Sequence, residues 1–322
     1  MSISFAFRAV VTVCAVLMET GIYAQSYPAT PIRFLVGFPP GGTNDIVARL
    51  LAQKLSETMG QSLVVENRGG ANTAIATELV ARAAPDGYTI LLNSPGHATN
   101  PSLMNLSFDS VKDFAFITLV AKTQNLLVVH PSLPSRNVKE LIAFSRKHPG
   151  QINYASGGTG TTVHLSGELF QHMTGVKWIH IPYKGTGPAV IELIAGHTSV
   201  SFPNMPGVIG HARSGKLRAL AVTSARRSAI APDIPTVDES GLPGFEVTAW
   251  YGVSAPARTP RAIIDRLNGE MVRALKSPDL REKLLAVGAE PVGTTPEEYT
   301  AHVQNEIGKW GKVIRAAGIK GQ

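Results

Sequence analysis

Two turns rich in glycine and threonine hold the residues of this 322-residue chain that are best suited to bind a small molecule. One reads FPPGGT from Phe38 to Thr43, and the other reads SGGTGTT from Ser156 to Thr162. Each follows a short apolar run and leads into a helical pattern. Glycine lets a ligand approach the main chain closely, and the free N–H groups of a first helical turn attract anions. Both turns therefore favour a site for a small anion.

A tight turn without a ligand is the alternative for either turn alone, whereas two turns in matching positions indicate two walls of one site. A nucleotide site does not fit the pattern. Neither turn ends in the Gly-Lys-Ser/Thr of a phosphate-binding P-loop, and the second lacks the third glycine of a dinucleotide fingerprint.

Further candidate contacts follow predicted strands, at the sheet edge where ligands of open α/β folds usually bind. His97 and His164 could donate to a carboxylate, although a lone histidine is also often a packing residue. A lysine such as Lys184 is more often solvated. We expect the Thr161 hydroxyl to donate a hydrogen bond to the ligand. The full set of expected contacts is Phe38, Pro39, Gly41, Gly42, Thr43, His97, Ser156, Gly157, Gly158, Thr159, Gly160, Thr161, Thr162, His164, Tyr183, Lys184 and Asn204.

The elements that must position these residues alternate between strand-like runs and helical patterns, which is typical of α/β folds with mostly parallel sheets. Strands are expected at 32–38, 62–67, 88–93, 114–121, 125–130, 152–156, 197–202, 217–223 and 252–256. Helices are expected at 44–58, 72–84, 137–147, 162–173, 186–195, 205–213, 260–275, 278–286 and 296–316.

Extended runs without helical period near 118–132 and 244–260 predict two crossings between lobes. The first lobe would then comprise residues 25–124 and 248–322, and the second would comprise residues 125–247. Each lobe would contain its own sheet, with the two crossings acting as the hinge.

The first 24 residues have the proportions of a secretory signal. Arg8 is the only early charge, and the run from Ala9 to Met18 is apolar except for Thr12. Such a run is too short to span a bilayer, and cleavage is expected near Ala24. A buried N-terminal helix is the alternative. The only cysteine, Cys14, lies inside this segment, so a cleaved chain could form no disulfide and no cysteine-metal site.

The net charge of +7 does not by itself indicate a nucleic-acid partner. Lysine and arginine are scattered, only Arg226 and Arg227 are adjacent, and no aromatic residues interleave with a basic cluster. We therefore expect no nucleic acid and no membrane-spanning segment, but a mild attraction for small anions.

The chain resembles the extracytoplasmic solute-binding proteins of tripartite tricarboxylate transporters, the Bug family. Blocks that carry the resemblance cover nearly the whole mature sequence, among them "FPPGGTNDIVAR", "VVENRGGANTAIATELVARAAPDGYTILL", "PYKGTGPAVIELIAGH" and "GAEPVGTTPEEYTAHVQNEIGKWGKVI". The resemblance implies a two-lobed periplasmic protein, of the Venus flytrap type, that closes around a small organic acid and performs no chemistry. It also implies that membrane permease subunits are its partners and that the second turn grips a carboxylate.

Two departures from the family pattern bear on the ligand. The family often has Pro-Gly-Ala-Gly after "ENR", where this chain has Gly69, Gly70, Ala71 and Asn72. The family also often has an acidic residue before the asparagine where Pro203 precedes Asn204. Without that acid, a partner for a ligand amino group is missing, which favours acids that lack an amine.

Two other classes of function remain open. A periplasmic enzyme on this scaffold would need a nucleophile with its base or a metal cluster, but no G-x-S-x-G elbow or H-E-x-x-H motif occurs. A ligand sensor that docks on a membrane signalling protein would share every feature of a transport receptor. We expect no catalytic residue, no metal and no cofactor, and a monomeric protein.

Overall fold

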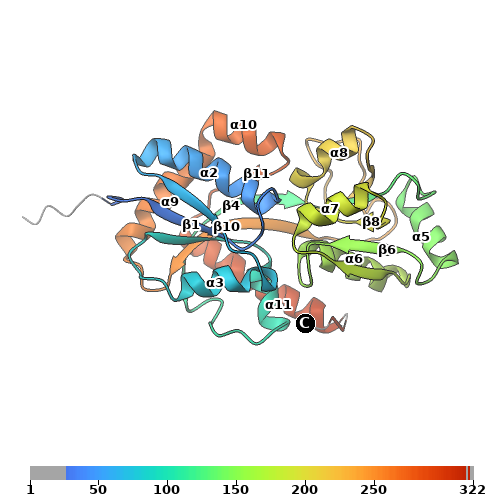
Figure 1. Cartoon of the computed structure of the whole chain (residues 1–322), viewed down its shortest axis with the longest axis horizontal. Coiled ribbons are helices and arrows are strands. Elements are labelled where there is room, and N and C mark those ends of the chain that lie inside the picture. The colour runs from blue at the N-terminus through green and yellow to red at the C-terminus, as the bar shows by residue number, and fades with distance from the viewer. Residues whose placement is uncertain (1–26, 317, 320–322) are drawn as a thin grey trace, which may run out of the picture.

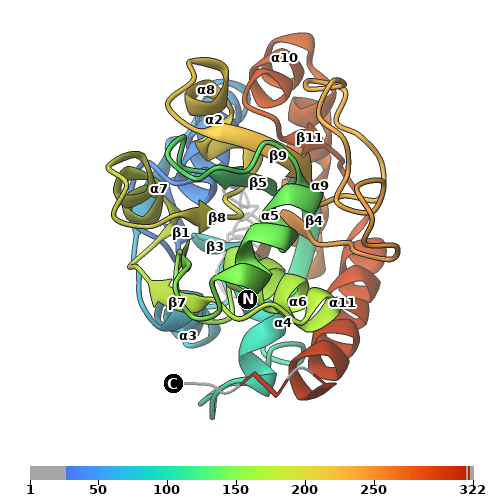
Figure 2. The same ribbon diagram turned by 90° about the vertical axis from the view of Figure 1, so that its right-hand side faces the viewer.

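Two mixed β-sheets, one in each lobe, organise the computed structural model, which describes residues 27–316, 318 and 319. The expected signal segment, residues 1–24, and its cleavage site near Ala24 lie outside the described residues. Figure 1 shows the two lobes side by side, with strands β4 and β10 extending from the first lobe toward the second. Figure 2 looks onto the second lobe, where α5 lies nearest the viewer.

The first sheet takes its strands from both ends of the described chain. Its strand order is β11 (Glu290–Pro291), β4 (Phe114–Gln124), β10 (Thr248–Pro256), β3 (Thr89–Asn93), β1 (Ile32–Val36) and β2 (Leu63–Asn67). The helices of this lobe are α2 (Thr43–Met59), α3 (Ala74–Ala81), α4 (Gly96–Thr99), α9 (Arg261–Lys276), α10 (Pro278–Ala286) and α11 (Pro296–Ala316), with short 3₁₀ turns η1 (Ala71–Thr73) and η2 (Asn100–Ser102).

The second sheet is formed by the middle of the chain. Its strand order is β7 (Ile179–Pro182), β6 (Asn153–Ser156), β8 (Val200–Ser201), β5 (Leu126–Val129) and β9 (Arg218–Val222). It carries helices α5 (Val138–Lys147), α6 (Thr162–Thr174), α7 (Thr186–Ile194) and α8 (Ile209–Arg213), with the 3₁₀ turn η3 (Met205–Gly207). The helices flank this sheet in Figure 2, with α5 and α6 on one side and α7 and α8 on the other.

The expectation of mostly parallel sheets needs a correction, because both sheets are mixed. β1 pairs in parallel with β2 and β3, but β10 pairs antiparallel with β3 and β4, and β11 pairs antiparallel with β4. The physical reason is the double crossing between lobes. β4 leads the chain out of the first lobe and β10 brings it back, so the two strands run in opposite directions beside each other from Thr248 opposite Gln124 to Pro256 opposite Phe114.

Two expected helices are shorter than their sequence patterns, and two strands, β7 and β11, were missed. The pattern at 72–84 gives α3 only from Ala74, because Ala71, Asn72 and Thr73 all have positive φ angles, and the pattern at 205–213 splits into η3 and α8. β7 is a sheet edge with two exposed and two half-buried residues that ends at Pro182, and β11 is an edge strand of two residues. The short sequence of β7 has no strong alternation, and an edge strand tolerates proline.

Apolar residues pack on both faces of the first sheet. On one face, α2, α9 and α10 bury Leu51, Leu267 and Leu284 against β1 and β4. On the other, a continuous cluster contains residues of both sheets and includes Trp250 of β10 and Trp310 of α11. Among the described residues, no helix has both the length and the apolar character that a membrane crossing requires.

Candidate functional site

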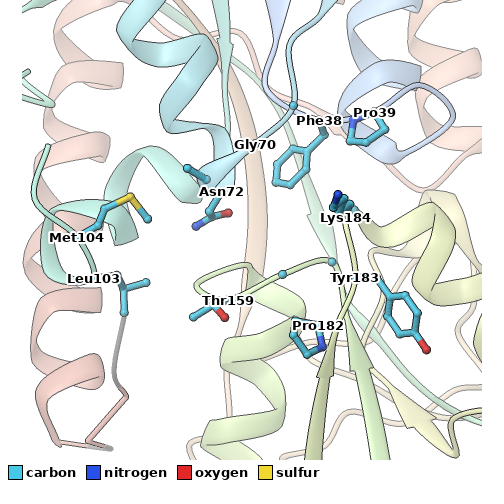
Figure 3. Close-up of a pocket in the computed structure, with 15 residues that line it drawn as sticks. Phe38, Pro39, Gly70, Asn72, Leu103, Met104, Thr159, Pro182, Tyr183 and Lys184 are labelled. Carbon is cyan, nitrogen blue, oxygen red and sulfur yellow. The ribbon is translucent and has the colours of Figure 1, made fainter. Parts of the chain in front are cut away.

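Two adjoining cavities lie between the lobes, and the residues of both glycine turns contribute to them. The outer cavity has a volume of about 680 Å³ and the inner pocket about 20 Å³. Phe38 and Asn72 line both, so they form the neck where the two meet. Figure 3 shows these two side chains on one side of the outer cavity, with Thr159 and Pro182 of the second lobe facing them.

The outer cavity is largely apolar and is large enough for a small organic molecule. Lys184 is the only charged residue among its described lining residues. The Tyr183 ring points away from the cavity in Figure 3. The lining residues are Phe38, Pro39, Gly69, Gly70, Ala71, Asn72, Leu103, Met104, Gly157, Gly158, Thr159, Pro182, Tyr183, Lys184 and Gly185.

The inner pocket is polar and about the size of one water molecule in this closed arrangement. A carboxylate group can enter it only if the lobes move apart slightly. None of the described residues that line either space is acidic. The inner lining consists of Phe38, Asn44, Asn72, Ser94, Pro95, Gly96, Thr161, Thr162, Val163, Thr186, Asn204, Ala249 and Tyr251.

Free polar groups from both lobes meet at this inner pocket. On the second lobe, the backbone amides of Thr162 and Val163 are the first two of α6. They make no hydrogen bond to any described residue. On the first lobe, the buried Ser94 hydroxyl has no partner among the described residues. The Tyr251 hydroxyl has that of Thr43 as a neighbour, without a hydrogen bond of standard geometry. Such groups are costly to bury unless a ligand or water satisfies them.

Asp45 in α2 holds the first turn in its conformation. The Asp45 carboxylate accepts hydrogen bonds from the Gly41 amide at 3.0 Å and from the Asn67 side chain at 3.0 Å. Asn67 also donates to the Phe38 carbonyl at 2.9 Å. Burial alone would raise the pKa of Asp45, but hydrogen bonds from Arg49, Gly41 and Asn67 outweigh it and lower this pKa. The turn is thus held against an ionised carboxylate that does not itself reach the cavities.

The second turn is held in place by the N-cap of α6. Thr161 Oγ1 accepts from the His164 amide at 3.2 Å and donates to the Gly158 carbonyl at 2.7 Å. In this structure the only proton of this hydroxyl is donated to Gly158, so donation to a ligand would require that bond to break, and a contact between Thr161 and a ligand stays a prediction. Gly160 has φ +80°, which favours glycine, and there is no room for a side chain beside Asn72.

A buried histidine, His164, and a half-buried one, His180, pack beneath the second turn and support it. His164 Nδ1 accepts from the Gly160 amide at 3.1 Å, and His180 Nε2 lies 2.6 Å from Ser156 Oγ. The centres of the two imidazole rings are 4.2 Å apart. Burial lowers the pKa of His180 to about 4, and burial together with the His180 charge lowers that of His164 to about 3. Both imidazoles are therefore neutral at pH 7, so His164 supports the turn and does not present a cation to the pocket.

His97, another expected ligand contact, packs within the first lobe. Its ring is buried in the first lobe, where Nε2 lies 2.7 Å from the Ser110 carbonyl and Nδ1 lies 3.1 Å from Asn93 Nδ2. It packs edge-on against Phe114 and Phe116. Burial lowers its pKa to about 4, although the Ser110 bond opposes this. The ring lines neither cavity.

Direct contacts between the lobes close the site. The Thr99 hydroxyl of α4 donates to the Gly160 carbonyl across the cleft at 2.9 Å. Pro39 of the first turn lies close to Gly185 of the second lobe, where a Cβ atom would be 3.3 Å from Pro39 Cδ. The structure is therefore a closed arrangement of the two lobes.

The expected contacts divide into those that line a cavity and those that support one. Phe38 lines both spaces; Pro39, Gly157, Gly158, Thr159, Tyr183 and Lys184 line the outer cavity; Thr161, Thr162 and Asn204 line the inner pocket. The described lining does not include Gly41, Gly42, Thr43, His97, Ser156, Gly160 or His164. Whether any of these residues touches a ligand stays a prediction.

The sequence pattern did not indicate several residues that line the cavities. Asn72 stood out only as a departure from a family pattern, and Ser94, Leu103 and Met104 did not stand out at all. The position of Ser94 directly after a predicted strand could have indicated that it lines a site. Nothing in the sequence distinguished Leu103 and Met104, since a pair of apolar residues after Asn-Pro-Ser looks like ordinary packing.

Comparisons with known proteins agree with this architecture. The model of the Tripartite tricarboxylate transporter family receptor matches residues 47–319. Protein BugT of Bordetella pertussis is 41% identical over 302 residues, which cover 93% of this chain and 93% of that protein.

Two solved structures are similar over most of both chains. "R. palustris Rpa4515 with adipate" has a TM-score of 0.89 and 38% identity and covers 92% of this chain and 100% of that one. "MatC (Rpa3494) from Rhodopseudomonas palustris with bound malate" has a TM-score of 0.85 and 32% identity and covers 89% of this chain and 100% of that one. With its two lobes, its closed cleft and a family match over most of its length, the chain belongs to the tripartite tricarboxylate transporter receptors, the group of solute-binding proteins that includes BugT.

Proposed function

We propose that this protein captures a small organic acid between its lobes and delivers it to the membrane permease of a tripartite tricarboxylate-type transporter. The proposal keeps the predicted lobes, residues 25–124 with 248–322 and residues 125–247, with β4 and β10 as the hinge. It also assigns export to the periplasm, removal of residues 1–24 and a monomeric state.

The observation that carries the proposal is the pair of unpartnered amides at the start of α6. Thr162 and Val163 present their N–H groups to a pocket whose described lining has no acidic residue. A helix N-terminus favours an anion by about 0.3–1 kcal/mol, and each hydrogen bond to a charged group adds about 1.5–3 kcal/mol. A carboxylate is the small organic anion that fits two adjacent donors. Several such bonds, less the cost of ordering the ligand, are sufficient for roughly micromolar affinity.

The related structures support the class of ligand. The two similar proteins of known structure described above were solved with adipate and with malate, which are both dicarboxylates. The large outer cavity leaves room for the rest of such a molecule beyond the carboxylate at α6. Lys184 at its edge offers a positive charge to a second anionic group.

A thermal-shift screen of the purified mature protein against a library of organic acids tests this proposal. An acid at a hundred times its dissociation constant should add about 2.7 kcal/mol of stability and raise the melting midpoint by several degrees. Neutral sugars and divalent metal ions serve as controls. Stabilisation by sugars or metals alone, with none by acids, would refute the assignment.

Recovery of the bound acid separates a receptor from an enzyme. After prolonged incubation with the protein, an acid that stabilises it should be found chemically unchanged by mass spectrometry. Conversion of the acid at a rate proportional to protein concentration would favour the enzyme instead.

A further inference from the structure

Asn72 lies at the neck between the two cavities and is held there in an unfavourable backbone conformation. Ala71, Asn72 and Thr73 have φ angles of +46°, +47° and +79°, in the left-handed region that residues with a side chain rarely adopt. Strain of this kind persists only where the surroundings enforce it, and it concentrates at functional sites. Gly96 allows the chain to pack closely here, since a Cβ atom at that position would lie 2.5 Å from the Asn72 carbonyl oxygen.

The hydrogen bonds around Asn72 determine which way its amide faces. The Asn100 amide donates to the Asn72 carbonyl at 2.8 Å, so Asn100 Oδ1 is left as an acceptor, and Asn72 Nδ2 donates to it at 3.0 Å. The Thr99 hydroxyl donates its proton to the Gly160 carbonyl, so this hydroxyl too can only accept a hydrogen bond from Asn72 Nδ2, at 3.2 Å. Both contacts of the Asn72 amino group are therefore to acceptors.

This orientation leaves Asn72 Oδ1 as a buried acceptor with no donor among the described residues. It lies next to Gly96, which lines the inner pocket. A carboxylate oxygen placed there would be repelled, because both groups only accept hydrogen bonds. The group that approaches Asn72 must instead carry an O–H or N–H proton. Since neither cavity has an acidic residue in its described lining, a cationic amine would lack a counter-charge.

We propose that Asn72 is a specificity-determining residue that selects 2-hydroxy acids over the corresponding acids without the hydroxyl. The inference rests on the proposed function, in which α6 holds the carboxylate. Asn72 lies beside the turn that precedes α6, because a Cβ atom at Gly160 would be 2.8 Å from Asn72 Nδ2. A hydroxyl on the carbon next to the carboxylate is therefore the donor that reaches Asn72 Oδ1. The remainder of the ligand extends past Phe38 into the outer cavity.

Isothermal titration calorimetry with matched pairs of acids tests this inference. Malate and succinate differ only in a 2-hydroxyl group, as do mandelate and phenylacetate. For at least one pair, the wild-type protein should bind the hydroxy acid about tenfold or more tightly than its partner. In Asn72→Gly, which removes the acceptor and suits the positive φ angle, this preference should fall to about twofold or less, while the affinity for the acid without the hydroxyl stays within about threefold.

The matched control is Asn305→Ala, on an exposed position of α11, which should keep the wild-type preference. Equal binding of both members of every pair by the wild type overturns the inference but leaves the proposed function standing. A preference that survives in Asn72→Gly also overturns it. Binding of neither member of any pair, with no stabilisation by any organic acid, overturns the proposed function and this inference with it.

Discussion

Adjacent threonines of the second turn have different roles, although the sequence offers no reason to distinguish them. Thr161 uses its hydroxyl both as donor and as acceptor within the turn. The Thr162 hydroxyl accepts only a long contact of 3.4 Å from Asn204, whose amide is already bound to Asn125 at 2.6 Å. The Thr162 hydroxyl proton has no acceptor among the described residues, so we predict that Thr162 donates to the ligand.

Replacing Thr162 with valine should weaken binding of an organic acid by about 1–3 kcal/mol, because a donor to the carboxylate is lost while the side-chain shape is kept. Calorimetric titration with the acid that stabilises the protein most measures the change. Thr300→Val, in α11 away from the site, is the control and should bind as the wild type does. If Thr162→Val also binds like the wild type, the hydroxyl of Thr162 does not contact the ligand.

At the scale of elements, the N-terminus of α6 depends on strands β6 and β7 beneath it. His180 in β7 bonds Ser156 at the end of β6, and the Tyr154 ring of β6 stacks on His180 with ring centres 4.8 Å apart. Tyr154 donates to Glu168 of α6, which also lies 3.7 Å from His164 Nε2. This packing fixes the turn that presents the two free amides.

Acid should destabilise the protein through its buried histidines. The pKa values of His97, His164 and His180 are lowered from 6.5 to about 4, 3 and 4, so the unfolded chain binds more protons than the folded one below pH 6.5. Their contribution is fully present above about pH 6.5 and is lost as the pH falls toward 4 and 3. Each histidine can contribute up to about 1.4 kcal/mol per pH unit in that window. Chemical denaturation at pH 7.5, 6, 5 and 4.5 measures the slope.

A pair of histidine variants separates this effect from general acid denaturation. His180→Gln should show a shallower loss of stability between pH 6.5 and 4.5 than the wild type. His172→Gln, on the exposed side of α6, should retain the wild-type slope. Equal slopes in all three proteins would mean that protonation of His180 does not limit stability.

For the whole molecule, the closed cleft implies that ligand binding and lobe movement are linked. The Thr99 hydroxyl contributes one hydrogen bond between the lobes, to Gly160. Thr99→Val should therefore favour the open form and weaken binding of a stabilising acid by about 0.5–1.5 kcal/mol. Small-angle scattering of the wild type should show a smaller radius of gyration with saturating acid than without it. An unchanged radius would contradict closure around the ligand.

Export is a prediction about the complete chain. The apolar run after Arg8 has the proportions of a signal, and a secreted protein should lose it near Ala24. Mass spectrometry of the protein recovered from the periplasm should give an N-terminus at about Gln25. Recovery of a periplasmic protein that still begins at Met1 would refute cleavage.

The order of elements and the location of the site could be predicted from the sequence alone, because both depend on local patterns. Apolar periodicity indicated helices at 44–58, 162–173 and 296–316, which the structure confirms as α2, α6 and α11 within two residues. Glycine and threonine between a strand and a helix marked both turns. Two extended runs without helical period marked the crossings, and these became β4 with β5 and β10.

Only the tertiary structure decided which atoms of the site are free. Local pattern shows that Thr161 and Thr162 both carry hydroxyls. Thr161 donates its proton to Gly158 within the same turn, whereas Thr162 accepts from Asn204, which a segment distant in sequence brings close. Asn72 likewise gained its orientation from Asn100, Thr99 and Gly160, all of them at least 27 positions away in the sequence. Hydrogen-bond partners depend on distances between segments far apart in sequence. The sequence therefore determined where an anion site would form, whereas the packing of two lobes decided which groups remain to bind the ligand.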